Sequence, residues 1–266
     1  MIPVREIKEK AREYGVPVSS IERDYAQNWL LKNLAHINMA LKGGTGIRKV
    51  YIENYRFSDD LDFTLLEDIS AEGIKNEINA AVQRSREESG ISFFEDLLLM
   101  ENENGYELNV YFQITLKGKN RMRIKIDITR LDKEKMLIPP VERKIIHPYS
   151  DDLDATIKVY SLEEIVVEKI RSLFERTRPR DVYDVWFLWD KISVEEVLKI
   201  LPEKFKIKNV EMDIKDFEER RESFKKAWNS SLRNQLRDLP EFDEVFSKVF
   251  EEVEKMCLET IKKMER

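Results

Sequence analysis

Apolar and polar side chains alternate along several short stretches of the first 160 residues, and a period of two predicts strands. The strictest alternation is at 107–116, where Leu108 and Val110 share one face and Asn109 and Tyr111 share the other. Residues 156–160 form a short apolar run that we also assign to a strand. The expected strands are therefore residues 60–66, 107–116, 121–129 and 156–160.

A period of three to four residues predicts helices between these strands. Residues 19–41 are expected to form one long helix, because Ser19 with Glu22 is a capping-box signature and the paired glycines after Leu41 end the pattern. Further helices are expected at 45–54 and 71–88.

From Ser161 onward every patterned segment is helical. Ser161 with Glu164 forms another capping box, Pro179 is suited to open the next helix, and Ser193 with Glu196 caps a third. Two more helices are expected at 213–232 and 240–264. The chain is thus predicted to be α+β, with one domain at 1–160 and a helical carboxy-terminal domain at 161–266.

Two carboxylates stand in the first predicted strand. Asp60 and Asp62 are alternate residues, so a strand would direct both to one face, about 7 Å apart along the backbone. Two like charges on one rigid face repel, and a divalent cation with a preference for oxygen ligands, such as Mg²⁺, resolves the conflict. Gly43 and Gly44 upstream let backbone approach a ligand closely. The pattern favours metal-dependent phosphoryl or nucleotidyl chemistry.

Each of these features also has a simpler explanation. Asp60 and Asp62 can form a solvated strand face, and Gly43 with Gly44 can end a helix. A third carboxylate, Asp127, lies on the strand at 121–129, where it can simply pair with Lys125 or its other basic neighbours. The glycines and the three carboxylates together favour the metal-binding interpretation.

Composition narrows the class of protein. The 266 residues are 42% hydrophobic, which supports a real core, and the net charge of −6 disfavours a simple basic nucleic-acid-binding module. The one cysteine, Cys257, excludes an internal disulfide and fits a reducing cytoplasm. No apolar stretch has the length of a membrane span, so we expect a soluble, cytoplasmic protein.

Several segments stand out in order over roughly residues 20 to 190: Ile21-Glu22-Arg23-Asp24-Tyr25, Leu41-Lys42-Gly43-Gly44-Thr45, Tyr55-Arg56-Phe57-Ser58-Asp59-Asp60-Leu61-Asp62-Phe63, Lys125-Ile126-Asp127-Ile128, Tyr160-Ser161-Leu162-Glu163-Glu164 through Lys169, and Arg180-Asp181-Val182-Tyr183-Asp184. As a set they resemble the AbiEii/AbiGii family of nucleotidyltransferase-like toxins, within the DNA polymerase β-type nucleotidyltransferase fold. The gap between Gly44 and Asp60 is longer than in the generic nucleotidyltransferase pattern.

The resemblance implies a small mixed sheet followed by a helical bundle, and a two-metal mechanism that uses Mg²⁺, with Mn²⁺ as an alternative. Asp60 and Asp62 would bridge the metals, and Asp127 would hold the metal that activates the acceptor hydroxyl. The residues implied to contact the triphosphate are Gly43, Gly44, Thr45 and Ser58. Lys169 would neutralise phosphate charge, and Asp184 would position Lys169 or the acceptor.

The same resemblance implies the function. We expect an enzyme that moves a nucleoside monophosphate from an NTP to an acceptor hydroxyl, with a tRNA 3′ end as the acceptor. It would act as the toxin of a type IV toxin–antitoxin system, opposed by a cognate antitoxin protein. Two alternatives stay open: a nucleotidyltransferase that modifies a protein side chain or a small molecule such as an aminoglycoside, and a non-catalytic nucleotide-binding module.

Overall fold

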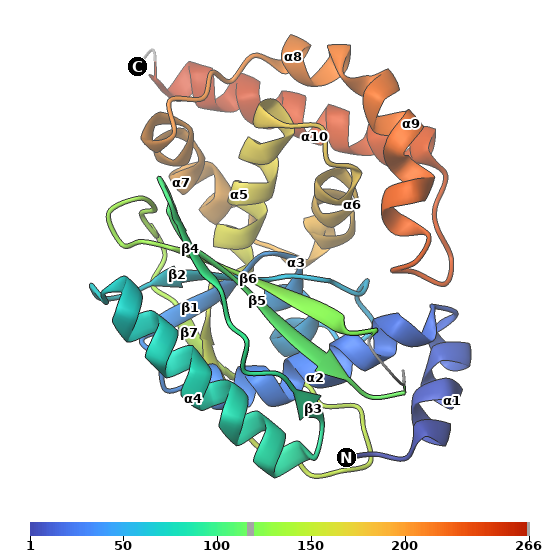
Figure 1. Cartoon of the computed structure of the whole chain (residues 1–266). Coiled ribbons are helices and arrows are strands. Elements are labelled where there is room, and N and C mark those ends of the chain that lie inside the picture. Colours follow the sequence, from blue (N-terminus) through green and yellow to red (C-terminus); the bar gives the residue numbers. More distant parts are fainter. Residues whose placement is uncertain (116–119, 265–266) are drawn as a thin grey trace. The chain divides into compact units, whose positions relative to one another are not determined.

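The computed structural model describes residues 1–115 and 120–264, and its chain forms two compact units. The amino-terminal unit consists of Met1–Glu134 and Pro140–Tyr160, and the carboxy-terminal unit of Lys135–Pro139 and Ser161–Arg266. The amino-terminal unit contains a mixed sheet with helices, and the carboxy-terminal unit contains helices (Figure 1). The predicted α+β class, with a mixed sheet followed by a helical bundle, is confirmed.

The sheet of the amino-terminal unit has eight described strands in the order β3-β5-β6-β2-β1-β8-β7, with β4 paired to β5 outside this path. The strands are β1 (Met39–Lys42), β2 (Leu61–Leu65), β3 (Ser92–Phe93), β4 (Leu99–Asn102), β5 (Gly105–Gln113), β6 (Met122–Thr129), β7 (Val141–Lys144) and β8 (Thr156–Val159). The central strand β2 runs parallel to β6 and antiparallel to β1. This pairing brings segments about 60 residues apart in the sequence side by side.

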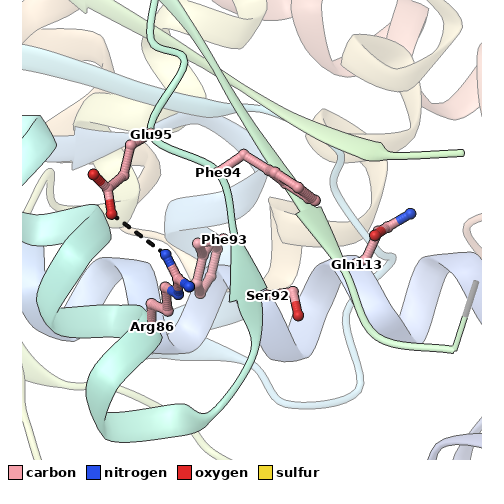
Figure 2. Close-up of a pocket in the computed structure, with 6 residues that line it drawn as sticks. All are labelled: Arg86, Ser92, Phe93, Phe94, Glu95 and Gln113. Carbon is pink, nitrogen blue, oxygen red and sulfur yellow. Dashed lines mark hydrogen bonds and ion pairs between the residues drawn. The ribbon is translucent and has the colours of Figure 1, made fainter. Parts of the chain in front are cut away.

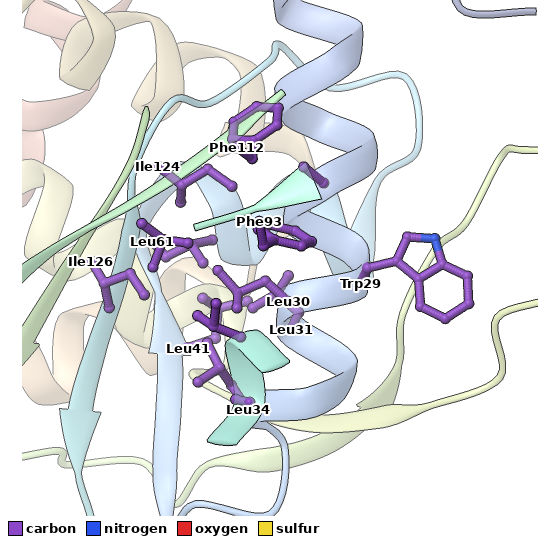
Figure 3. Close-up of a cluster of buried hydrophobic side chains, with 14 of the residues drawn as sticks. Trp29, Leu30, Leu31, Leu34, Leu41, Leu61, Phe93, Phe112, Ile124 and Ile126 are labelled. Carbon is purple, nitrogen blue, oxygen red and sulfur yellow. The ribbon is translucent and has the colours of Figure 1, made fainter. Parts of the chain in front are cut away.

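Two helices, α2 (Val18–Leu34) and α4 (Ala71–Ser89), contact each other and strands of the sheet (Figure 1). Figure 3 shows side chains of α2 directed at Leu41, Leu61 and Ile126 of the strands. These α2 side chains are Leu30, Leu31 and Leu34. Because strand residues alternate between faces, the neighbouring Lys42, Asp62 and Asp127 project from the opposite face of the sheet. The core therefore occupies one face and leaves the other for polar groups.

The predicted helix at 19–41 is confirmed as far as Leu34 and is wrong beyond it. The helix α2 ends at Leu34, and Met39–Lys42 is the strand β1. The apolar residues Ile37 and Leu41 fit a helical period, but together with Met39 they also alternate at a period of two. The expected cap is wrong as well: Pro17 precedes the helix, and the Glu22 carboxylate accepts a hydrogen bond from the Thr115 backbone N–H (2.7 Å).

The other strand predictions are confirmed to within a few residues, although residue 116 of the second strand lies outside the described residues. The pattern did not reveal β3, β4 or β7, which are only two to four residues long. It also missed the first helix, α1 (Val4–Tyr14). The predicted helix at 45–54 corresponds to a short α-helix, α3 (Gly43–Gly46), that continues as the π-helix η1 (Ile47–Tyr51).

In the carboxy-terminal unit the described helices are α5 (Leu162–Glu175), α6 (Pro179–Leu188), α7 (Val194–Ile207), α8 (Ile214–Glu219), α9 (Arg221–Leu232) and α10 (Phe242–Met264), with a single 3₁₀ turn at η2 (Trp189–Lys191). The predicted helix at 213–232 is two helices that meet at Arg220. Phenylalanine rings fill the space between α8, α9 and α10. Phe217 packs edge-on against Phe224, and the centres of the Phe217 and Phe246 rings are 4.8 Å apart. Cys257 of α10 is buried, and burial raises its pKa to about 12.

The cap of α5 differs from a capping box in one respect. The Ser161 hydroxyl accepts a hydrogen bond from the Glu164 N–H, as predicted (3.1 Å). The Glu164 carboxylate, however, accepts from the backbone N–H groups of Leu137 and Ile138 (3.1 Å each) and pairs with the buried Lys204 ammonium (2.7 Å). These bonds attach the segment Lys135–Pro139 to the helices of this unit.

A buried ionic cluster anchors the segment that follows Gly43 to α2. The Asp24 carboxylate of α2 accepts hydrogen bonds from Arg48 (2.6 Å) and the Tyr149 hydroxyl (2.8 Å) and pairs with Lys49 (2.7 Å). Burial disfavours the Asp24 charge, but the two cations outweigh burial and hold the pKa of Asp24 well below its usual range. Burial lowers the pKa of Lys49 to about 8, in spite of Asp24.

We expect Asp24→Asn to destabilise the protein strongly. The substitution keeps the shape but leaves Arg48 and Lys49 buried without their counter-charge, which typically costs about 3–5 kcal/mol. Urea unfolding followed by circular dichroism measures the loss. Asp154→Asn is the control, since the Lys144–Asp154 pair is largely exposed and should contribute about 1 kcal/mol or less. Equal midpoints for the two variants would contradict an anchoring role for Asp24.

Candidate active site

Four side chains form one row across neighbouring strands of the amino-terminal unit. Asp62 of β2 lies in register with Asp127 of β6 on one side and with Lys42 of β1 on the other. Glu107 of β5 is the register partner of Asp127. Adjacent strands are about 4.8 Å apart, so the Asp62 and Asp127 backbones are neighbours although they are far apart in the sequence. Two predicted metal ligands therefore stand side by side on the polar face.

Gly43 is adjacent to this pair. Its φ angle is +69°, in the left-handed region that favours glycine, and a Cβ atom built there would lie 3.0 Å from Oδ2 of Asp62. The missing side chain thus leaves space beside the Asp62 carboxylate. Gly44 is constrained differently, because a Cβ atom there would approach Nη2 of the buried Arg56 to 2.6 Å.

The glycine turn and the start of β2 are tied together by hydrogen bonds. The hydroxyl of the buried Thr45 donates a hydrogen bond to the Asp60 carbonyl, which connects the glycine turn to the backbone just before β2. Gln27 of α2 donates Nε2 to the carbonyls of both Ser58 and Asp59, each at 3.1 Å. Asp60 lies one residue before β2 begins. Of the predicted nucleotide-binding residues, Gly43 thus lies beside Asp62, Thr45 is bonded to the backbone of Asp60, and the Ser58 carbonyl is bonded to Gln27.

A second anchor comes from Arg23, one helical turn before Gln27. It forms an ion pair with Asp59 and donates Nε to the Arg123 carbonyl of β6 (3.2 Å). The same helix thus contacts the start of both strands that carry the carboxylates.

Lys125 lies two residues before Asp127 on the same face of β6 and forms an ion pair with it. Its Nζ lies 3.0 Å from Oδ2 of Asp127 and 2.9 Å from Oε2 of Glu107. Burial raises the pKa of Asp127, the hydrogen bond from Lys125 opposes this, and the charge of Asp62 adds to it. Burial and the charge of Asp62 thus outweigh the effect of Lys125 on the pKa of Asp127.

This donor set fits a divalent cation. Carboxylate oxygens are the ligands that Mg²⁺ and Mn²⁺ prefer, and the repulsion between Asp62 and Asp127 favours a bound cation. In the described part of the chain, however, no three His, Cys, Asp or Glu side chains converge closely enough to hold a metal ion. The predicted set of Asp60, Asp62 and Asp127 is thus represented here by an adjacent pair, Asp62 and Asp127.

The remaining predicted residues lie in the carboxy-terminal unit. Lys169 of α5 places its ammonium 2.7 Å from Asp181 and 3.0 Å from Asp184 of α6. Both carboxylates are buried, and Arg176 lies 3.1 Å from the second oxygen of Asp181. Burial opposes the charge of Asp181, but Lys169 and Arg176 lower its pKa overall. Lys169 thus contacts both Asp181 and Asp184, and the roles of Lys169 and Asp184 toward the nucleotide stay a prediction.

Sequence reasoning missed Glu107, Arg23 and Gln27. Glu107 and Asn109 are alternate residues of β5, so the period of two already placed Glu107 on the polar face of the strand. Arg23 lies within a segment that carried the family resemblance but had no assigned role. Nothing in the sequence distinguishes Gln27 from other polar helix residues, because its contacts are with backbone carbonyls 31 and 32 residues away.

A separate pocket of about 430 Å³ lies beside β3 and the end of β5 (Figure 2). Gln113, which lines it, is six residues beyond Glu107, or about 20 Å along the strand. Glu95 and Arg86 also line the pocket, and they form an ion pair with each other at 3.4 Å. We assign the pocket no part in the chemistry of the carboxylate row.

The mixed sheet, with two acidic strands side by side next to a glycine turn, belongs to a fold that a solved nucleotidyltransferase shares. Two solved structures share the fold. JHP933 from Helicobacter pylori has 18% identity and a TM-score of 0.60, with 94% of this chain and 97% of that chain covered. MenT4, a nucleotidyltransferase toxin from Mycobacterium tuberculosis, has 16% identity and a TM-score of 0.63, with 97% of this chain and 94% of that chain covered. No curated protein sequence matches the chain.

The family follows from the sequence itself. The family described as nucleotidyl transferase AbiEii toxin, type IV TA system, matches residues 27–248. The chain belongs to this AbiEii family and is a nucleotidyltransferase, which confirms the predicted family and enzyme class. Within the described residues, no helix is both long and apolar enough to cross a membrane.

We expect Gly43→Ala to lower activity more than Gly90→Ala. Both glycines have a φ angle near +70°, so alanine should cost about 1–2 kcal/mol of stability at either position. Only at position 43 would the methyl group also press on Asp62, since the nearest atom at Gly90 is 3.8 Å away. Urea unfolding and NTP turnover measure the two effects. Equal activity of the variants would show that the space beside Asp62 is not needed.

We expect Lys169→Met to lower stability as well as activity. The substitution leaves Asp181 and Asp184 buried next to each other, and removing one partner of a buried ion pair typically costs about 3–5 kcal/mol. Urea unfolding measures this, with Lys199→Met as the control, because the Lys199–Glu195 pair is exposed. Unchanged stability with lost transfer would show that Lys169 serves the reaction alone.

Proposed function

We propose that this AbiEii-family enzyme transfers a nucleoside monophosphate from an NTP to an acceptor hydroxyl on RNA, at a tRNA 3′ end, with a divalent cation as cofactor. The acceptor oxygen forms a bond to the α-phosphorus, the bond to the β-phosphate oxygen breaks, and pyrophosphate leaves. The observation that carries this proposal is the register of Asp62 and Asp127 beside Gly43.

The chain's own residues suit this chemistry in distinct ways. Asp62 and Asp127, with Asp60 just before β2, would hold Mg²⁺ or Mn²⁺, which neutralises charge on the attacking and leaving oxygens of such a displacement. Gly43 leaves space beside Asp62 for a phosphate group. The roles of Gly44, Thr45, Ser58, Lys169 and Asp184 toward the nucleotide follow from the family.

The acceptor is the part of the proposal that depends on the family. Two basic residues of α9, Arg221 and Lys225, both pair with Asp243 at 2.9 Å and 2.6 Å, so they add no support for an RNA acceptor. The name of MenT4 describes a nucleotidyltransferase toxin, and the family belongs to type IV toxin–antitoxin systems. We therefore also propose that the protein acts as a cytoplasmic toxin with a cognate antitoxin protein.

Incubation with total RNA, Mg²⁺ and each α-³²P-labelled NTP in turn tests the proposal. We expect a labelled band of tRNA size, and we expect Asp62→Asn and Asp127→Asn each to lower labelling by about 100-fold or more, as loss of a group that stabilises a transition state does. Neither variant should lower the free energy of unfolding by more than about 1 kcal/mol, because each removes one of two like charges and the Lys125–Asp127 pair is partly exposed.

Asp68→Asn is the matched control, because Asp68 is an exposed aspartate six residues beyond Asp62. Label on protein that is lost in Asp62→Asn would move the acceptor to a side chain. NTP binding without label on any macromolecule would favour a small-molecule acceptor or a non-catalytic binding module. Full labelling by both aspartate variants would overturn the assignment of the site.

A further inference from the structure

Lys125 bridges two carboxylates at the centre of the candidate site. Its Nζ is 2.9 Å from Oε2 of Glu107 and 3.0 Å from Oδ2 of Asp127, and Asp127 is the register neighbour of Asp62. The side chains of Lys125, Glu107 and Asp127 are partly accessible to solvent, with exposed fractions of 28%, 25% and 35%. A lysine side chain has a flexible four-carbon stem, so a partly exposed ammonium can exchange one carboxylate for the other without repacking the core.

The charges of the row do not balance in this arrangement. Glu107, Asp127 and Asp62 supply three carboxylates across three adjacent strands. Lys42, on the fourth strand, directs its ammonium to the Thr129 hydroxyl (3.3 Å) and toward the Tyr160 ring (5.7 Å). Lys125 thus holds Asp127, the carboxylate that a divalent cation would share with Asp62.

We propose that Lys125 is a resident counter-ion that yields Asp127 to an incoming divalent cation, and that Glu107 is the carboxylate onto which the ammonium then withdraws. Glu107 is on this account a positioning residue that acts through Lys125. This inference rests on the proposed function, because it presumes that Asp62 and Asp127 hold a cation.

Two single substitutions have opposite expected effects on affinity for Mn²⁺, the probe ion. Lys125→Met removes the competitor for Asp127, so binding should tighten about threefold to fivefold, the upper part of the range for an exposed ion pair. Glu107→Gln removes the alternative partner and leaves Lys125 on Asp127, so binding should weaken by about the same factor. Titration with Mn²⁺, with the free ion measured by electron paramagnetic resonance, gives both affinities without any turnover.

The double-mutant cycle separates this exchange from a simple sum of charges. If Glu107 acts through Lys125, then Glu107→Gln should change Mn²⁺ affinity by only about twofold or less in the Lys125→Met background. An equal effect in both backgrounds would overturn the inference, since the charges would then act independently. Arg123→Met is the charge control: Arg123 is exposed, lies two residues from Lys125 on the same strand face, and should change affinity by less than about twofold.

The titration also distinguishes failure of the inference from failure of the proposed function. Mn²⁺ binding that is lost in Asp127→Asn, combined with equal effects of Glu107→Gln in both backgrounds, leaves the metal-dependent function standing and overturns only the exchange. Absence of Mn²⁺ binding by the wild-type protein overturns both. All substituted side chains are partly or fully exposed, and circular dichroism melting verifies that each variant is folded.

Discussion

The parallel pairing of β2 with β6 in one register is the constraint on which the site depends. It places the Asp62 and Asp127 backbones about 5 Å apart, and two charges at that spacing repel by about 3 kcal/mol at an effective dielectric constant of 20. The opposing term lies on the other face of the same strands, where Leu61, Phe63, Ile126 and Ile128 are buried. Each buried side chain of this kind contributes about 1.5–3 kcal/mol, so the core outweighs the repulsion. A slip of one residue would turn the core residues of one strand toward the polar face, and the register is therefore set by the core.

The rest of the amino-terminal unit fixes what lies next to these carboxylates. Asp24 holds Arg48 and Lys49, which follow the glycine turn, and Gln27 holds the carbonyls that precede Asp60. All of these contacts come from α2, the helix whose apolar face packs on the sheet. Buried ion pairs such as that of Asp24 add little net stability relative to apolar residues of similar size. Their effect here is geometric: one rigid helix sets the positions of the turn and of the strand that carries Asp62.

The sequence predicted the parts of this arrangement that depend on local period. Strands β2, β5 and β6 alternate clearly, and Asp62 and Asp127 were recognised as candidate ligands. The strand β1 was mistaken for helix because Ile37 and Leu41 satisfy both periods, and β3, β4 and β7 are too short to show any period. The row itself could not be predicted, because it depends on which strands pair and in which register. Lys125 illustrates the limit: its pairing with Asp127 was considered as an alternative to metal binding, whereas the structure shows the ion pair and the carboxylate pair together.

In the described part of the chain, Lys204, Lys169 and Lys125 each lie between two carboxylates, and they differ in how far their side chains are exposed. Lys204 lies 2.7 Å from Glu164 and 3.4 Å from Glu168 and is fully buried, so it cannot move without leaving charges unpaired in the core. Lys169 lies between Asp181 and Asp184, and its side chain is 12% exposed while both of its partners are buried. Lys125 retains 28%, and water can compensate for whichever carboxylate it releases. A lysine between two carboxylates is therefore structural where it is buried from water, and it can exchange partners where it is exposed to water. Lys125, the most exposed of the three, lies next to the pair Asp62 and Asp127.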